Sequence, residues 1–106
     1  MASGILGQIN LTVASTWTSV YTVPAGKVAT LNLAILNVGA VSASMRVAIS
    51  TTTSPSVSEY IEFGMILAPS DVFERGGLVL DASKKIVVWA SHASPNMAIL
   101  VTGYEE

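Results

Sequence analysis

The sequence predicts an all-β fold, a single-domain antiparallel β-sandwich of about eight strands. Apolar side chains alternate with polar ones at a spacing of two, as in strands that bury one face. Val, Ile, Thr, Trp and Tyr, which suit a pleated surface, are abundant. Turn signals recur about every 8–12 residues, the spacing typical of sandwiches and small barrels. Jelly-roll and immunoglobulin-like topologies both fit this pattern.

The strands follow one another with short polar turns between them. We expect strands near residues 8–13, 17–23, 28–37, 42–50, 59–67, 72–80, 85–92 and 97–104. Turns fall at 24–27, 38–40, 51–57, 68–71, 81–84 and 93–96, each rich in Pro, Gly, Ser, Asn or Asp. Four strands show a shared face by alternation: Trp17, Ser19, Tyr21 and Val23; Ala29, Leu31, Leu33 and Ile35; Met45, Val47 and Ile49; Ile61, Phe63 and Met65.

Two other segments complete the organisation. Residues 1–8 are uncharged and interrupted by glycine, and we interpret them as an N-terminal arm that precedes a sandwich domain at 9–106. Such an arm could add a strand to a neighbouring subunit. Paired glycines, Gly76 and Gly77, inside a strand pattern predict a β-bulge.

The composition excludes several classes of protein. Of 106 residues, 51% are hydrophobic and 11% charged, where about 25% charged is typical of soluble domains. High hydrophobicity excludes a disordered chain. Five basic residues against seven acidic ones exclude electrostatic binding of nucleic acid. With no Cys and one His, the chain offers neither a disulfide framework nor a multi-histidine metal site.

High hydropathy also raises the possibility of a membrane span. The most apolar long window, 31–49, contains Arg46 and two Asn, so we expect no spanning helix and no membrane partner. The N-terminus has no basic or apolar signal segment, which favours synthesis and retention in a cytoplasm.

No arrangement of residues predicts catalysis. His92 is expected at a strand end without a marked nucleophile. Glu59 and Glu62 stand three apart in a strand and so point to opposite faces, unlike a glycosidase pair. We therefore expect no enzyme, no cofactor and no metal. Five aromatic residues have rings suited to stacking on sugars, with core or interface packing as the simpler interpretation: Trp17, Tyr21, Tyr60, Trp89 and Tyr104.

The charge deficit predicts association. A domain of this size exposes much surface, and here that surface must be largely Ser, Thr, Ala, Gly and aliphatic. Large apolar patches on soluble domains mark association sites. Exposed strand edges are usually protected by Lys, which is scarce in this chain. We expect a homo-oligomer, for instance a trimer, or a component of a lattice.

The order of several short motifs resembles one family. Residues 21–27 read Tyr-Thr-Val-Pro-Ala-Gly-Lys, a motif of small bacteriophage virion structural proteins. The chain departs from the family at 81–84, Asp-Ala-Ser-Lys, where an Ala-Gly-Asp-like turn is expected. The similarity extends over residues 6–106 and includes a strand ending at Asn37, the segments 60–62, 74–80 and 86–91, and the terminal 103–106.

This resemblance implies a β-sandwich in a phage particle, assembled in the host cytoplasm. We expect a non-enzymatic capsid decoration (cement) protein that binds and stabilises the lattice of the major capsid protein. The alternative is a tail, neck, baseplate or fibre module that contacts other virion proteins, with glycan binding as an option. The residues expected at its interfaces are Ile5, Leu6, Gln8, Pro24, Ala25, Lys27, Pro55, Glu62, Glu74 and Arg75.

Overall fold

The computed structural model confirms the all-β sandwich and all eight expected strands. It describes residues 3–11, 13–91 and 97–106, so His92 and the turn expected at 93–96 lie outside the described residues. A short 3-10 helix, η1 (Val57–Glu59), precedes β5. The strands are β1 (Ser3–Leu11), β2 (Thr18–Thr22), β3 (Ala29–Asn37), β4 (Ala43–Ser50), β5 (Tyr60–Leu67), β6 (Val72–Leu80), β7 (Lys85–Ala90) and β8 (Met97–Glu105).

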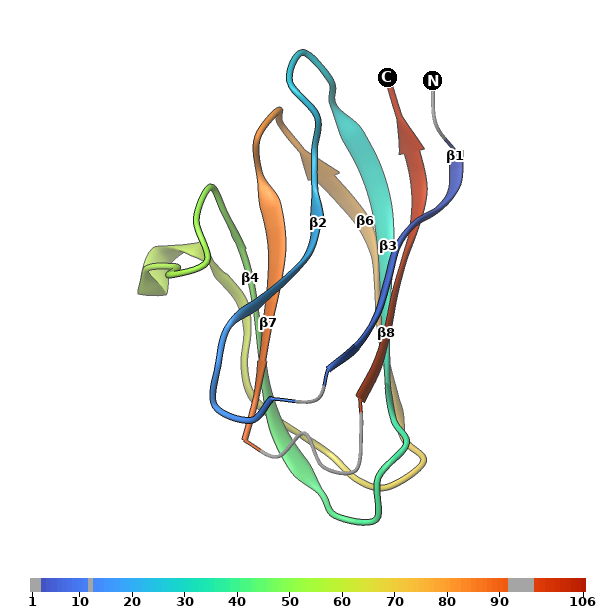
Figure 1. Cartoon of the computed structure of the whole chain (residues 1–106), viewed down its shortest axis with the longest axis vertical. Coiled ribbons are helices and arrows are strands. Elements are labelled where there is room, and N and C mark those ends of the chain that lie inside the picture. Colours follow the sequence, from blue (N-terminus) through green and yellow to red (C-terminus); the bar gives the residue numbers. More distant parts are fainter. Residues whose placement is uncertain (1–2, 12, 92–96) are drawn as a thin grey trace.

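The strand order identifies the topology as a jelly roll. One sheet has the order β1-β8-β3-β6 and the other β2-β7-β4-β5, and every pair is antiparallel. The first strand pairs with the eighth, the second with the seventh, the third with the sixth and the fourth with the fifth. This is the pairing of one long hairpin wrapped into two sheets. It differs from an immunoglobulin sandwich, whose first two strands lie side by side in one sheet. Figure 1 shows the two sheets face to face.

The core between the sheets follows the predicted alternation. Ala29, Leu31, Leu33 and Ile35 of β3 are at most 1% exposed, and all face the opposite sheet. In β4, alternation places Met45 and Val47 in the same core. Burial of a side chain of this size contributes about 1.5–3 kcal/mol relative to exposure. The core therefore fixes which face of each sheet remains outside, and the outer faces are where binding can occur.

The N-terminal boundary is the main correction to the sequence prediction. The arm expected at 1–8 does not precede the sandwich, because β1 begins at Ser3 and pairs with β8 as far as Tyr104. Low apolar content hid this strand, since Ser3, Gly4 and Gly7 carry little hydrophobic signal. Gly7 is required here because a Cβ atom would lie 2.7 Å from the Val20 carbonyl oxygen of β2.

Two bulges change the faces expected for aromatic residues. The register of β2 against β7 shifts between Ser19 and Tyr21, so Tyr21 enters the core and does not share a face with Trp17. In β5 the register shifts near Gly64, whose φ is +73°, and Phe63 turns outward to 62% exposure. Both predicted faces were wrong, because a bulge inserts one residue and the side chains beyond it then point to the opposite face of the sheet.

The bulge expected at the paired glycines is confirmed. Leu31 pairs with Leu78 and Leu33 with Arg75, so Gly76 and Gly77 together oppose one residue of β3. Gly77 has a φ of +71°, a conformation that glycine adopts without strain.

The turns divide between the two ends of the sandwich. The start of β1, the end of β8, the 24–27 turn and the 81–84 turn lie at one end, the top of Figure 1. The 38–42 turn and the 68–71 turn lie at the other end. There the buried side chain of Asn37 holds both turns. Its Nδ2 donates to the carbonyls of Val41 and Leu67 at 2.9 Å, and its Oδ1 accepts from the Gly39 amide at 2.9 Å.

Candidate interaction surfaces

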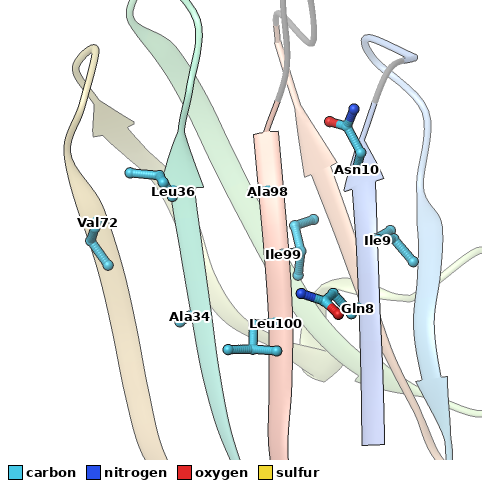
Figure 2. A pocket seen from close by; sticks show the side chains of 9 residues that line it. All are labelled: Gln8, Ile9, Asn10, Ala34, Leu36, Val72, Ala98, Ile99 and Leu100. Carbon is cyan, nitrogen blue, oxygen red and sulfur yellow. The ribbon is translucent and has the colours of Figure 1, made fainter. Parts of the chain in front are cut away.

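The outer face of the β1-β8-β3-β6 sheet carries a shallow, largely apolar groove. Two rungs of cross-strand neighbours form it: Gln8–Leu100–Ala34 and Asn10–Ala98–Leu36–Val72. Figure 2 shows these side chains on the neighbouring strands. The outer groove has a volume of about 560 Å³, and its lining residues are Gln8, Ile9, Asn10, Ala34, Leu36, Val72, Ala98, Ile99 and Leu100.

The groove differs from its surroundings in charge. None of its lining residues is charged, and Leu36 and Val72 are 37% and 51% exposed. A second depression of about 360 Å³ adjoins it, and here Glu74, Arg75 and Asn32 contribute polar groups. An apolar centre with a polar border is the usual anatomy of a protein interface.

The structure brings only some of the expected interface residues together. Gln8 lines the outer groove, and Glu74 and Arg75 line the adjoining depression. Arg75 also donates from Nη1 to the Ile61 carbonyl at 3.2 Å, so it links β6 to β5 across the side of the sandwich. Glu62 belongs to β5 of the other sheet and is half-buried.

The remaining residues expected at interfaces lie on β1 or in the connections between strands. Ile5 is exposed and Leu6 packs on the core, but both belong to a strand already paired with β8. Pro24 and Ala25 of the 24–27 turn are exposed, and Lys27 and Pro55 are half-buried. None of these turn residues lines the outer groove.

A cluster of four aromatic rings and one arginine lies on the outer face of the other sheet. The ring centroids of Trp17 and Tyr60 are 5.4 Å apart, and those of Tyr60 and Phe63 are 5.6 Å apart. The guanidinium carbon of Arg46 lies 4.6 Å from the Phe63 centroid and 4.0 Å from the Trp89 centroid. We call Trp17, Arg46, Tyr60, Phe63 and Trp89 the aromatic–arginine cluster.

The strand register explains how these five side chains meet. Arg46 of β4 pairs with Trp89 of β7 and Phe63 of β5, so these three form one rung. On the next rung Ala48 pairs with Val87 and Tyr60. Ala48 and Val87 are fully buried although they lie outside the central core. Trp17 contacts Tyr60 of this rung, and this contact joins the indole to the other rings.

Two further groups show perturbed ionisation. Burial raises the pKa of Tyr21 well above its usual value, and the hydrogen bond to Glu105 and the charge of that carboxylate raise it further. Hydrogen bonds from the Ser56 backbone, Ser50 and the Ser56 hydroxyl lower the pKa of Glu59, with help from the charge of Lys84. Both groups stabilise local structure: the first joins the two sheets, and the second orders the loop before η1.

Glu59 lies in η1 and not, as predicted, in one strand with Glu62, which belongs to β5. Oε1 of Glu59 accepts from Ser50 and from the Ser56 amide, so its role is to cap a loop. Among residues 3–11, 13–91 and 97–106, no three His, Cys, Asp or Glu side chains gather as a metal site would require.

Comparisons of the chain with known protein families, curated proteins and solved structures found no match. Within the described residues no helix has the length and apolar character needed to cross a membrane.

The sequence did not predict that the residues of either surface lie together. It indicated Trp17, Tyr60 and Trp89 as possible sugar-stacking residues but not Phe63 or Arg46, because the bulge at Gly64 sets the face of Phe63. The arginine carried a signal: it is a lone charge in the apolar window 31–49.

Proposed function

We propose that the chain is a non-enzymatic structural subunit of a bacteriophage particle, placed as a decoration protein on the capsid. The observation that carries this proposal is the outer groove, an uncharged apolar surface spanning all four strands of one sheet. Apolar surface of this kind on a small soluble domain marks a site covered in an assembly. The resemblance of residues 21–27 to a motif of bacteriophage virion proteins is the reason for proposing a phage particle as that assembly.

The low charge of the whole chain supports the same conclusion. Only 11% of residues are charged, and a free domain of this size ordinarily depends on more surface charge for solubility. A decoration subunit requires no catalytic group, only a rigid scaffold and a face that fits its neighbours. The jelly roll supplies rigidity because its two sheets share one continuous core.

Self-association through the outer groove is tested by light scattering at micromolar concentration. Wild-type protein is expected to exceed the monomer mass of 11.0 kDa. Leu36→Lys places a charge in the groove and is expected to shift the protein toward monomer. The matched control is Val57→Lys, since Val57 is 79% exposed on η1, outside the groove. A wild-type protein that is monodisperse at 11.0 kDa would contradict association through this face.

Placement in the particle is tested by copy number. Quantified gels of purified virions are expected to show hundreds of copies, as repeated attachment to a capsid lattice requires. A count from a few to dozens would instead place the protein in the tail, neck, baseplate or a fibre. Absence of the protein from purified virions would refute a structural role in the particle altogether.

A further inference from the structure

The aromatic–arginine cluster contains a guanidinium group that forms no hydrogen bond or ion pair with any described residue. Nε of Arg46 is buried, and no described residue accepts a hydrogen bond from it. No hydrogen bond involving the guanidinium group occurs among the described residues. A buried donor left unpaired costs about 1–3 kcal/mol, so native proteins retain few of them.

The two flanking rings determine how this charge can be used. Phe63 and Trp89 lie against the guanidinium at 4.6 Å and 4.0 Å and hold it by cation–π interaction. The rings also exclude water from its faces, which strengthens any ion pair formed at its edge. Guanidinium donors form a planar fork that matches the two oxygens of a carboxylate. The ligand chemistry complementary to Arg46 is therefore a carboxylate.

The rings beside the arginine indicate what carries that carboxylate. Trp17, Tyr60 and Phe63 adjoin one another at 5.4 Å and 5.6 Å between centroids, and Phe63 is 62% exposed. Ala48 and Val87, which share a rung with Tyr60, are fully buried and anchor this part of the sheet. Sugar rings present flat C–H faces that pack on aromatic rings, and an acidic sugar carries its carboxylate on the same ring.

The position of the cluster favours a saccharide over an acidic peptide. Extended peptides bind to sheets by adding a strand at an edge, where backbone groups are unpaired. The cluster's arginine is on β4, an inner strand paired on both sides, and its contacts are made by side chains on the sheet face. We infer that the aromatic–arginine cluster binds acidic saccharides, with Arg46 pairing with the carboxylate and the adjacent aromatic rings packing on the sugar.

The inference is tested by titrating the full chain with oligogalacturonate, followed by tryptophan fluorescence and calorimetry. The matched ligand is the same oligosaccharide with its carboxylates methyl-esterified. A sialylated oligosaccharide is a second acidic probe, and poly-glutamate tests whether any polyanion suffices. We expect at least one acidic saccharide to bind at least tenfold more tightly than its esterified or desialylated form, and more tightly than poly-glutamate.

Variants assign the binding to the cluster. Arg46→Gln is expected to lose at least tenfold in affinity for the acidic saccharide, and Phe63→Ala to weaken it. Lys27→Gln removes a half-buried cation in the 24–27 turn, outside the cluster, and is the control expected to leave binding unchanged. Phe63 is exposed enough for its truncation to leave the fold intact, which circular dichroism verifies in every variant.

Several results would overturn the inference. These are no binding of either acidic probe, equal affinity for the esterified ligand, or unchanged affinity in folded Arg46→Gln. Tighter binding of poly-glutamate would identify a protein partner instead. Self-association measured by light scattering is independent of these titrations, so the proposed structural role and this site can fail separately.

Discussion

Asn37→Ala is expected to destabilise the domain by about 2–6 kcal/mol. The side chain is 1% exposed and forms three hydrogen bonds of 2.9 Å. Water can replace the bonds to Val41 and Gly39, which are only partly buried, and each such loss costs about 0.5–1.5 kcal/mol. The carbonyl of Leu67 is buried, so its lost partner leaves an unsatisfied acceptor that costs about 1–3 kcal/mol.

Urea unfolding followed by circular dichroism measures this loss at one fixed protein concentration, because association alters apparent stability. A loss of that size lowers Tm by roughly 10 °C or more in a domain of this length. Asn32→Ala is the matched control, since Asn32 lies on the same strand but is exposed on the outer face. Equal unfolding free energies for the two variants would refute the assignment of Asn37 as the residue joining both turns.

Three other predictions concern ionisation and packing. The pKa of Tyr21 is raised in the folded protein, so its hydroxyl stabilises the fold fully below about pH 10, the pKa of tyrosine in the unfolded chain. This stabilisation is lost at higher pH. Tyr21→Phe should therefore flatten the fall in unfolding free energy at alkaline pH. The pKa of Glu59 is lowered in the folded protein, so its carboxylate stabilises the fold above about pH 4.3, and this stabilisation is lost as pH falls. The NMR shift of the Ser56 amide, which donates to this carboxylate, should therefore titrate in the wild type but not in Glu59→Gln. Gly103→Ala should cost at least about 2–3 kcal/mol in urea unfolding, because its Cβ would overlap the Thr30 carbonyl oxygen at a φ of +149°.

Matched variants separate these effects from general disturbance. Tyr104→Phe alters an exposed tyrosine and should keep the alkaline fall that Tyr21→Phe removes. Gly26→Ala has a φ of +76° but open space around it, so it should cost only about 1–2 kcal/mol, from strain alone. Alkaline unfolding that is identical in both tyrosine variants, or equal costs for the two glycine variants, would contradict the predictions.

The strands were predictable because their signal is local. Alternation in Ala29–Asn37 follows directly from a buried face, and the turn residues mark where each strand ends. Strand pairing was not predictable, because the pairing of β1 with β8 joins residues about a chain length apart. The sequence therefore left jelly-roll and immunoglobulin-like topologies open until the sheet order was known.

The surfaces depended on details that composition conceals. Two register shifts, one on each side of Phe63 in the β4–β5 pairing, place it on the outer face beside Arg46 and not on the expected inner face. The outer groove combines β1, β8, β3 and β6, of which β1 lacked a clear apolar pattern at its start. Both surfaces depend on the register of strand pairing, and that register is determined by contacts between strands in the folded chain.

The two outer faces of the jelly roll are chemically unlike, and this bears on how the proposals combine. One face has an uncharged apolar groove, while the other has aromatic rings around a guanidinium that no described residue pairs with. Since the two sheets pack on opposite sides of one core, a subunit whose outer groove is covered in the assembly turns the aromatic–arginine cluster to the opposite side. On a lattice, many copies would then present the cluster together, and weak single sites would act with avidity. Acidic-saccharide binding by whole particles should therefore exceed that of the isolated chain by at least the hundredfold typical of linked sites.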